Sequence, residues 1–172
     1  MGILRYITFF LFFTIISSYA RNDNYSEIRL LQKLELLALK RGSIGKTYFY
    51  DIANRKDCNK SAIKYLGIIK TKNGKQFKVL SSFFVFNAAA TCHGSSSIKF
   101  YNLQNKYIGQ YHLSMPYDLP TYIFENKFIY WTNSKECISR KGFFLNLKNG
   151  LPSKFFLPCT VKGGDLYYFS TE

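Results

Sequence analysis

Apolar residues recur three and four positions apart between residues 24 and 41, which predicts one amphipathic helix over this segment. Asn24 and Glu27 are spaced as in a capping box at the start of a helix, and Gly42 suits the position that follows its end. The apolar stripe consists of Leu30, Leu31, Leu34, Leu37 and Ala38. We expect this helix to pack against a sheet.

After Gly42 the pattern changes to short runs rich in Ile, Val, Tyr, Phe and Thr, which are typical of strands. Turn residues separate the runs, with the strongest hairpin signals at Asn73-Gly74 and Asn149-Gly150. The predicted strands are 46–52, 63–71, 75–86, 97–103, 106–113, 121–124, 127–132, 141–147, 154–157 and 166–169. Gly94 to Ser97 is expected to form a flexible loop. The fold class is therefore mainly β, an antiparallel meander of about 8–10 strands closed as a barrel or folded as a sandwich.

The first twenty residues have the features of a cleaved signal peptide. Arg5 precedes an apolar run from Ile7 to Ile16, and Ser18 and Ala20 provide small residues before the expected cleavage point. Two threonines interrupt the run, which is shorter than the ~20 apolar residues of a spanning helix. The sequence thus predicts a secreted or periplasmic protein with a single domain over residues 21–172 and no transmembrane segment in the mature chain.

Export favours disulfides among the four cysteines, Cys58, Cys92, Cys137 and Cys159. A zinc site would require closely spaced pairs, whereas the gaps here are 34, 45 and 22 residues. Four cysteines allow three pairings. The two strong hairpin turns lie near the midpoints of 58–92 and 137–159, which favours these two pairs.

The histidines and carboxylates form no recognisable catalytic motif. Cys92 and His93 are adjacent and would point to opposite faces of a strand, and His112 is expected on the polar side of its strand. The loop and turn carboxylates are Asp118, Glu125, Glu136 and Asp165. The sequence gives no indication of a metal or cofactor, and no catalytic residue is assigned.

Positive charge is concentrated in the middle of the chain. The net charge is +14, and no Asp or Glu occurs between Cys58 and Tyr117. The lysines of this segment are Lys60, Lys64, Lys70, Lys72, Lys75, Lys78, Lys99 and Lys106. Lys64 and Lys70, an even number of residues apart, are expected on one face of their strand with Lys78 nearby. Lys64, Lys70, Lys78 and Lys99 are the candidate ligand-binding residues.

Aromatic residues make up 19% of the chain and have two expected roles. The phenylalanines are expected in the core, while the tyrosines and Trp131 are better candidates for exposed stacking because they carry a polar group. The tyrosines in question are Tyr48, Tyr50, Tyr101, Tyr107, Tyr111, Tyr117, Tyr122 and Tyr130.

These observations favour a small non-enzymatic protein that binds an anionic envelope component or extracellular ligand through a basic face. The partner would be a polyanion, an anionic membrane surface or an extracellular protein, and nucleic acid is not expected as its partner in vivo. Two alternatives remain open. One is a secreted hydrolase of an extracellular polymer with carboxylates near Asp118 and Glu125, and the other is an inhibitor or immunity-type protein with the segment from Ser114 to Pro120 as its binding loop.

Overall fold

The computed structural model describes residues 28–51, 58, 60–88, 91–130 and 137–171. The predicted signal peptide and the predicted start of the helix lie outside these residues. The chain divides into two compact units, residues 1–34 and 35–172. Within the described ranges, no helix is long and apolar enough to cross a membrane.

The predicted helix is present and is described over residues 28–41. It ends at Arg41, where Gly42 takes a positive φ of 65° and its N–H donates to the carbonyl of Ala38. This left-handed conformation is the reason for glycine after the helix end. In the larger unit, Glu35, Ala38 and Leu39 of the helix are buried.

All ten predicted strands are present, and the protein is mainly β as predicted. Their bounds differ from the predicted ones by a few residues, most of all where β4 starts. The strands are β1 (Thr47–Asp51), β2 (Lys60–Lys70), β3 (Gln76–Ala88), β4 (Thr91–Tyr101), β5 (Tyr107–Leu113), β6 (Tyr122–Phe124), β7 (Lys127–Ile129), β8 (Phe144–Asn146), β9 (Lys154–Pro158) and β10 (Gly164–Ser170). Two 3-10 helices, η1 (Pro116–Asp118) and η2 (Ile138–Arg140), lie in the connections.

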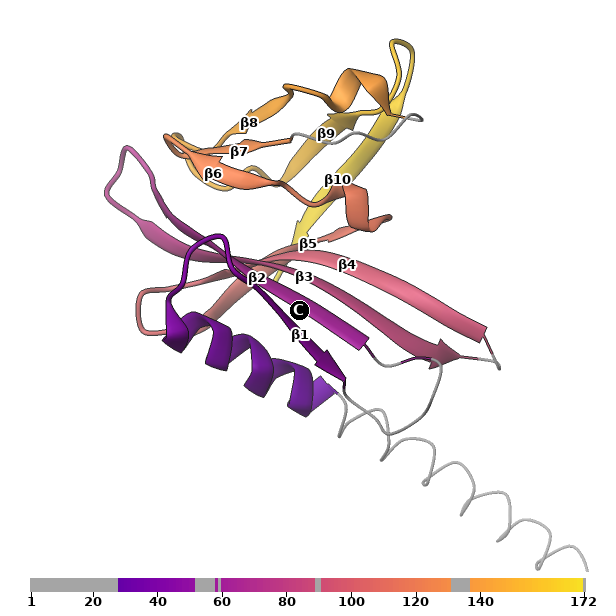
Figure 1. Cartoon of the computed structure of the whole chain (residues 1–172). Helices are drawn as coiled ribbons and strands as arrows, with labels where there is room; N and C mark the ends of the chain where they lie inside the picture. The colour runs from indigo at the N-terminus through magenta and orange to yellow at the C-terminus, as the bar shows by residue number, and fades with distance from the viewer. Residues whose placement is uncertain (1–27, 52–57, 59, 89–90, 131–136, 172) are drawn as a thin grey trace, which may run out of the picture. The chain divides into compact units, whose positions relative to one another are not determined.

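The strands form two antiparallel sheets (Figure 1). The seven-stranded sheet has the order β1-β2-β3-β4-β5-β10-β9, and the three-stranded sheet has the order β6-β7-β8. The main core contains residues of both sheets, among them Ile98, Phe100 and Tyr111 of the large sheet and Phe128 of the small one. The two sheets therefore pack face to face, with the main core between them.

A bulge in β2 changes which residues share a face of the large sheet. Lys64 pairs with Ser81 of β3, and Lys70 pairs with Gln76. The two lysines are six residues apart along β2, but their partners are only five residues apart along β3, because the register shifts at Leu66. Directly paired residues share a face, and successive residues alternate between faces. Lys64 and Lys70 therefore lie on opposite faces, and the expectation that they share one is wrong.

The segment from Gly94 to Ser97 belongs to β4 and is not the loop that was expected. It pairs with β3 throughout, with Gly94 opposite Val85. A Cβ atom on Gly94 would come within 2.9 Å of the ring of Phe83. The glycine thus makes room for a neighbouring aromatic ring, which is a packing role that local sequence does not distinguish from loop flexibility.

The structure contains the disulfides Cys58–Cys92 and Cys137–Cys159, the two pairs that the turn positions favour. The first joins the residues before β2 to the start of β4. The second joins the residue before η2 to the residue after β9.

Several tyrosines that were expected to be exposed are core residues. Tyr48, Tyr101, Tyr111 and Tyr130 are buried, whereas Tyr122 is exposed as expected and Trp131 lies outside the described residues. The Tyr111 hydroxyl donates to the carbonyl of Pro152 at 2.5 Å. A polar group on an aromatic ring is thus compatible with burial when the fold provides a partner for it.

This burial predicts how the fold responds to alkali. Burial raises the pKa of Tyr101, Tyr111 and Tyr130 above the ordinary value, and it raises that of Tyr167 to about 12. In the unfolded chain these phenols ionise near pH ~10. Their contribution to stability is therefore complete below pH ~10 and is lost as the pH rises from there through the folded-state values.

We expect cooperative unfolding above pH ~10, followed by circular dichroism, with the buried phenols ionising as the fold is lost. Tyr130→Phe should move this transition to higher pH, since it removes one buried ionisable group. Tyr168→Phe, at an exposed position, is the control and should leave the transition unchanged. Ionisation of the buried phenols near pH ~10 with the fold intact would contradict this expectation.

Candidate functional site: a basic end of the large sheet

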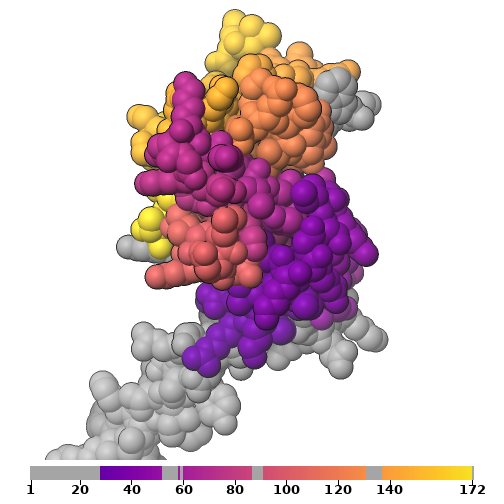
Figure 2. All heavy atoms as spheres, turned by 90° about the vertical axis from the view of Figure 1, so that its left-hand side faces the viewer, coloured from indigo at the N-terminus to yellow at the C-terminus, as the bar shows by residue number. Residues whose placement is uncertain are grey.

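Three turns that carry exposed lysines lie at one end of the large sheet, the end that faces the viewer in Figure 2. The turn between β2 and β3 and the turn between β4 and β5 lie at the same end because all four strands are antiparallel. The turn at residues 147–150 joins them, since the Lys72 N–H donates to the carbonyl of Lys148 at 2.8 Å. We call this surface the basic end; it consists of Lys70, Lys72, Lys75, Lys106 and Lys148.

The β2–β3 turn is held in place by its own hydrogen bonds. Thr71 and Lys75 are joined by a bond from the Thr71 N–H to the Lys75 carbonyl at 2.9 Å, and the Thr71 hydroxyl donates to the same carbonyl. Gly74 takes a positive φ of 80° and donates to the carbonyl of Thr71. The lysine backbones at this turn are thereby fixed, while their side chains extend into solvent.

The other two turns are built in the same way around asparagines. In the β4–β5 turn, the Asn102 side chain accepts from the Lys106 N–H at 2.8 Å, and Asn105 has a positive φ of 64°. In the turn after β8, the Asn146 side chain accepts from the Lys148 N–H at 3.0 Å. Short asparagine side chains stabilise tight turns of this kind.

The β6–β7 turn borders the basic end and carries its one neighbouring carboxylate. The Lys70 N–H donates to the side chain of Asn126 at 2.7 Å. Glu125 lies 3.8 Å from the ammonium group of Lys127. The four turns together thus carry several lysines and a single acidic residue, Glu125.

The four predicted ligand-binding lysines do not form one site. Lys70 is exposed at the basic end. Lys78 is half-buried, and its ammonium group donates to the side-chain oxygen of Asn105 at 2.7 Å. Lys64 is on the opposite face of the sheet and donates to the carbonyl of Thr121 at 2.7 Å. Lys99 forms an ion pair with Glu35 of the helix.

Lys99 forms an internal ion pair with Glu35, which is only 1% exposed. Its ammonium group lies 2.6 Å from one carboxylate oxygen, and the Tyr101 hydroxyl donates to the other at 2.8 Å. A buried carboxylate needs such partners. Lys99 therefore neutralises a helix carboxylate. Partial burial of the imidazole, and after it the positive charge of Lys99, lowers the pKa of His112.

Sequence reasoning did not single out Lys72, Lys75, Lys106 and Lys148 as site residues. The signal for Lys72 and Lys148 was available, because both lie between predicted strands and turn lysines are more exposed than strand lysines, whereas Lys75 and Lys106 begin predicted strands. No local signal placed Lys148 beside the β2–β3 turn, since the contact that joins the two turns is between Lys72 and Lys148, 76 residues apart in the chain.

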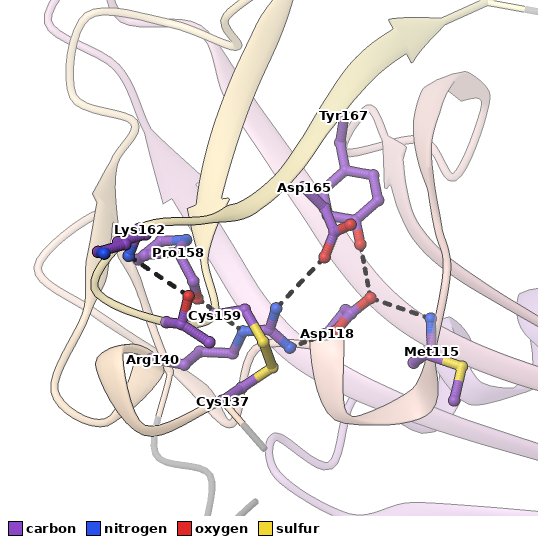
Figure 3. Close-up of a disulfide and its surroundings, with 10 residues drawn as sticks. Met115, Asp118, Cys137, Arg140, Pro158, Cys159, Lys162, Asp165 and Tyr167 are labelled. Carbon is purple, nitrogen blue, oxygen red and sulfur yellow. Dashed lines mark hydrogen bonds and ion pairs between the residues drawn. A yellow bond between two sulfur atoms is a disulfide. The ribbon is translucent and has the colours of Figure 1, made fainter.

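Asp118, a candidate for the hydrolase alternative, is part of a buried network (Figure 3). Its carboxylate pairs with the guanidinium of Arg140, and both side chains are at most 1% exposed. It also accepts from the Tyr167 hydroxyl at 2.5 Å and from the Met115 N–H at 3.0 Å. Arg140 in turn donates to the carbonyl of Pro158 at 3.1 Å. These contacts make Asp118 the internal counter-ion of Arg140.

The other candidate residues lie apart from this network or at its edge. Asp165 is half exposed, and its carboxylate lies 3.6 Å from the guanidinium group of Arg140. Glu125 is exposed in the β6–β7 turn, and Glu136 lies outside the described residues. The segment from Ser114 to Pro120, the proposed inhibitor loop, contains η1 and has both Asp118 and Pro120 buried. Comparison with family models, with curated proteins and with solved structures finds no match to this chain.

Proposed function

We propose that this is an exported binding protein whose basic end recognises an anionic polymer or surface. The observation that carries the proposal is the convergence of five exposed lysines from three well-ordered turns, with Glu125 as the one carboxylate on the neighbouring turns. A surface of one sign attracts the opposite charge and steers its approach. The two disulfides support export, because such bonds persist in oxidising compartments.

Replacing Lys70, Lys72 and Lys75 together with glutamate should weaken binding to heparin, used as a general polyanion probe, by at least about tenfold at physiological salt. The slope of log affinity against log salt should also fall, by ~3 if each lysine contacts one anionic group. The measurement is a titration followed by calorimetry at several salt concentrations.

The matched control reverses three exposed lysines away from the basic end, Lys60, Lys154 and Lys162. It changes the net charge by the same amount, so it separates a defined site from general attraction. Equal weakening by the two triple variants would overturn the proposal, and so would binding that does not depend on salt.

A further inference from the structure

The outer face of the small sheet is aromatic and exposed. In β6, Tyr122 and Phe124 are 45% and 57% exposed, and in β8, Phe144 is 52% exposed. The register places Tyr122, Ile129 and Phe144 in one row across the three strands. Phe124, Lys127 and Asn146 form the next row. The opposite face of the same sheet supplies Phe128 and Leu145 to the core region.

This arrangement differs from what the physics of a half-buried sheet leads one to expect. A sheet with one face on the core usually presents polar side chains to water on the other. Here three aromatic side chains and Ile129 cluster on the solvent face, and contiguous exposed apolar patches of this kind mark interaction sites. We call this surface the aromatic face; it consists of Tyr122, Phe124, Ile129 and Phe144.

The aromatic face is continuous with the basic end. The ammonium group of Lys127 lies 5.1 Å from the centre of the Phe144 ring. Asn126, in the turn that follows Phe124, accepts a hydrogen bond from the Lys70 backbone, and Asn146 of β8 accepts one from the Lys148 backbone. The ammonium group of Lys127 therefore lies against one of the exposed rings, and the backbones of Lys70 and Lys148 adjoin the turns that border the aromatic face.

We propose that the aromatic face binds sugar rings of an acidic polysaccharide, while Lys127 and the basic end bind its anionic groups. This inference rests on the proposed function and names the class of its ligand. The axial C–H groups of a pyranose carry partial positive charge, and they pack on the negative face of an aromatic ring. The row from Tyr122 to Phe144 spans two strand spacings, about 10 Å, which is the length of a disaccharide unit.

A polysaccharide fits this surface better than a lipid bilayer does. The three aromatic side chains are about half exposed and lie on the flat face of a sheet. Insertion into a bilayer favours apolar side chains that protrude from a tip or from one side of a helix. A flat row of rings beside a line of charges instead matches a polymer in which a ring and an anionic group recur together.

The test compares polymers that share charge but differ in rings. Heparin and polygalacturonate carry anionic groups on sugar rings, polyphosphate carries charge without rings, and dextran carries rings without charge. The double variant Tyr122→Ala/Phe144→Ala should bind heparin and polygalacturonate about tenfold more weakly, comparable to the loss of one aromatic stacking contact at a single-stranded nucleic acid site. Its salt slope and its binding of polyphosphate should be unchanged.

The control variant Phe156→Ala/Tyr168→Ala removes two aromatic side chains of the β9–β10 hairpin that are at least as exposed as Tyr122 and Phe144, 52% and 59%. It should bind all four polymers like the wild type. Unchanged polysaccharide binding by Tyr122→Ala/Phe144→Ala would overturn the inference and leave the proposed function standing. Absence of salt-dependent binding to any polyanion would overturn both. A larger loss for phosphatidylglycerol vesicles or for poly(dT) than for the polysaccharides would replace the sugar with a lipid or a base as the ligand of the aromatic face.

Discussion

Replacing Arg140 with methionine is expected to lower the free energy of unfolding by about 3–5 kcal/mol. Arg140 is fully buried and pairs with Asp118, which is 1% exposed. Methionine fills a similar volume without the charge, so the Asp118 carboxylate would remain buried with only the Tyr167 hydroxyl and the Met115 N–H as partners. Two neutral donors do not replace a guanidinium, and the variant would therefore bury an uncompensated charge.

Urea denaturation at neutral pH measures this loss. Lys162→Met makes the same chemical change at an exposed position of the β9–β10 turn, and its effect should stay within about 0.5 kcal/mol. Combining Arg140→Met with Asp118→Leu should restore part of the stability, since no charge is then buried.

An Arg140→Met variant as stable as Lys162→Met would contradict this account of the core. So would an Arg140→Met/Asp118→Leu variant no more stable than Arg140→Met, because the loss would then come from packing and not from the unpaired carboxylate.

Local patterns were sufficient to predict the elements of this fold. All ten strands and the described part of the helix were predicted, because alternating apolar residues and Asn-Gly turns act within a few residues. The disulfide pairing followed from the same turns, because a hairpin brings the residues at its open end together. Gly94 is the instructive exception, since the reason for a glycine there is the ring of Phe83 on the next strand.

The candidate site could be predicted only in part, because its geometry depends on contacts between distant segments. Counting residues along β2 placed Lys64 and Lys70 together, and the bulge at Leu66 separates them. Local sequence places no acidic residue near Lys99, whereas in the fold Lys99 pairs with Glu35 of the helix, 64 residues earlier in the chain. In both cases the sequence determined which residues are charged, while the tertiary structure determined which charges are neutralised.

Loss of the Cys137–Cys159 disulfide should destabilise the fold more than loss of Cys58–Cys92. Loop-closure entropy alone would give a slightly larger loss for the longer loop of Cys58–Cys92, since loops of 34 and 22 residues both give about 3–4 kcal/mol. We expect a larger loss for Cys137–Cys159 because this disulfide fixes the segment that contains Arg140. Cys137 and Cys159 flank the segment that positions Arg140, whose backbone N–H donates to the carbonyl of Cys137 at 3.2 Å. The Ser139 N–H likewise donates to the carbonyl of Cys159 at 3.1 Å.

A double-mutant cycle separates this positioning role from the entropy of the loop. The variant Cys137→Ala/Cys159→Ala should be less than additive with Arg140→Met, with a coupling of about 1 kcal/mol or more, because the bond and the ion pair stabilise the same segment. Cys58→Ala/Cys92→Ala, which alters a different part of the large sheet, should be additive with Arg140→Met within about 0.5 kcal/mol. Equal coupling for both disulfides would mean that η2 is held by the surrounding core alone. Selective coupling would mean that the second disulfide stabilises the fold by keeping a buried arginine opposite its carboxylate.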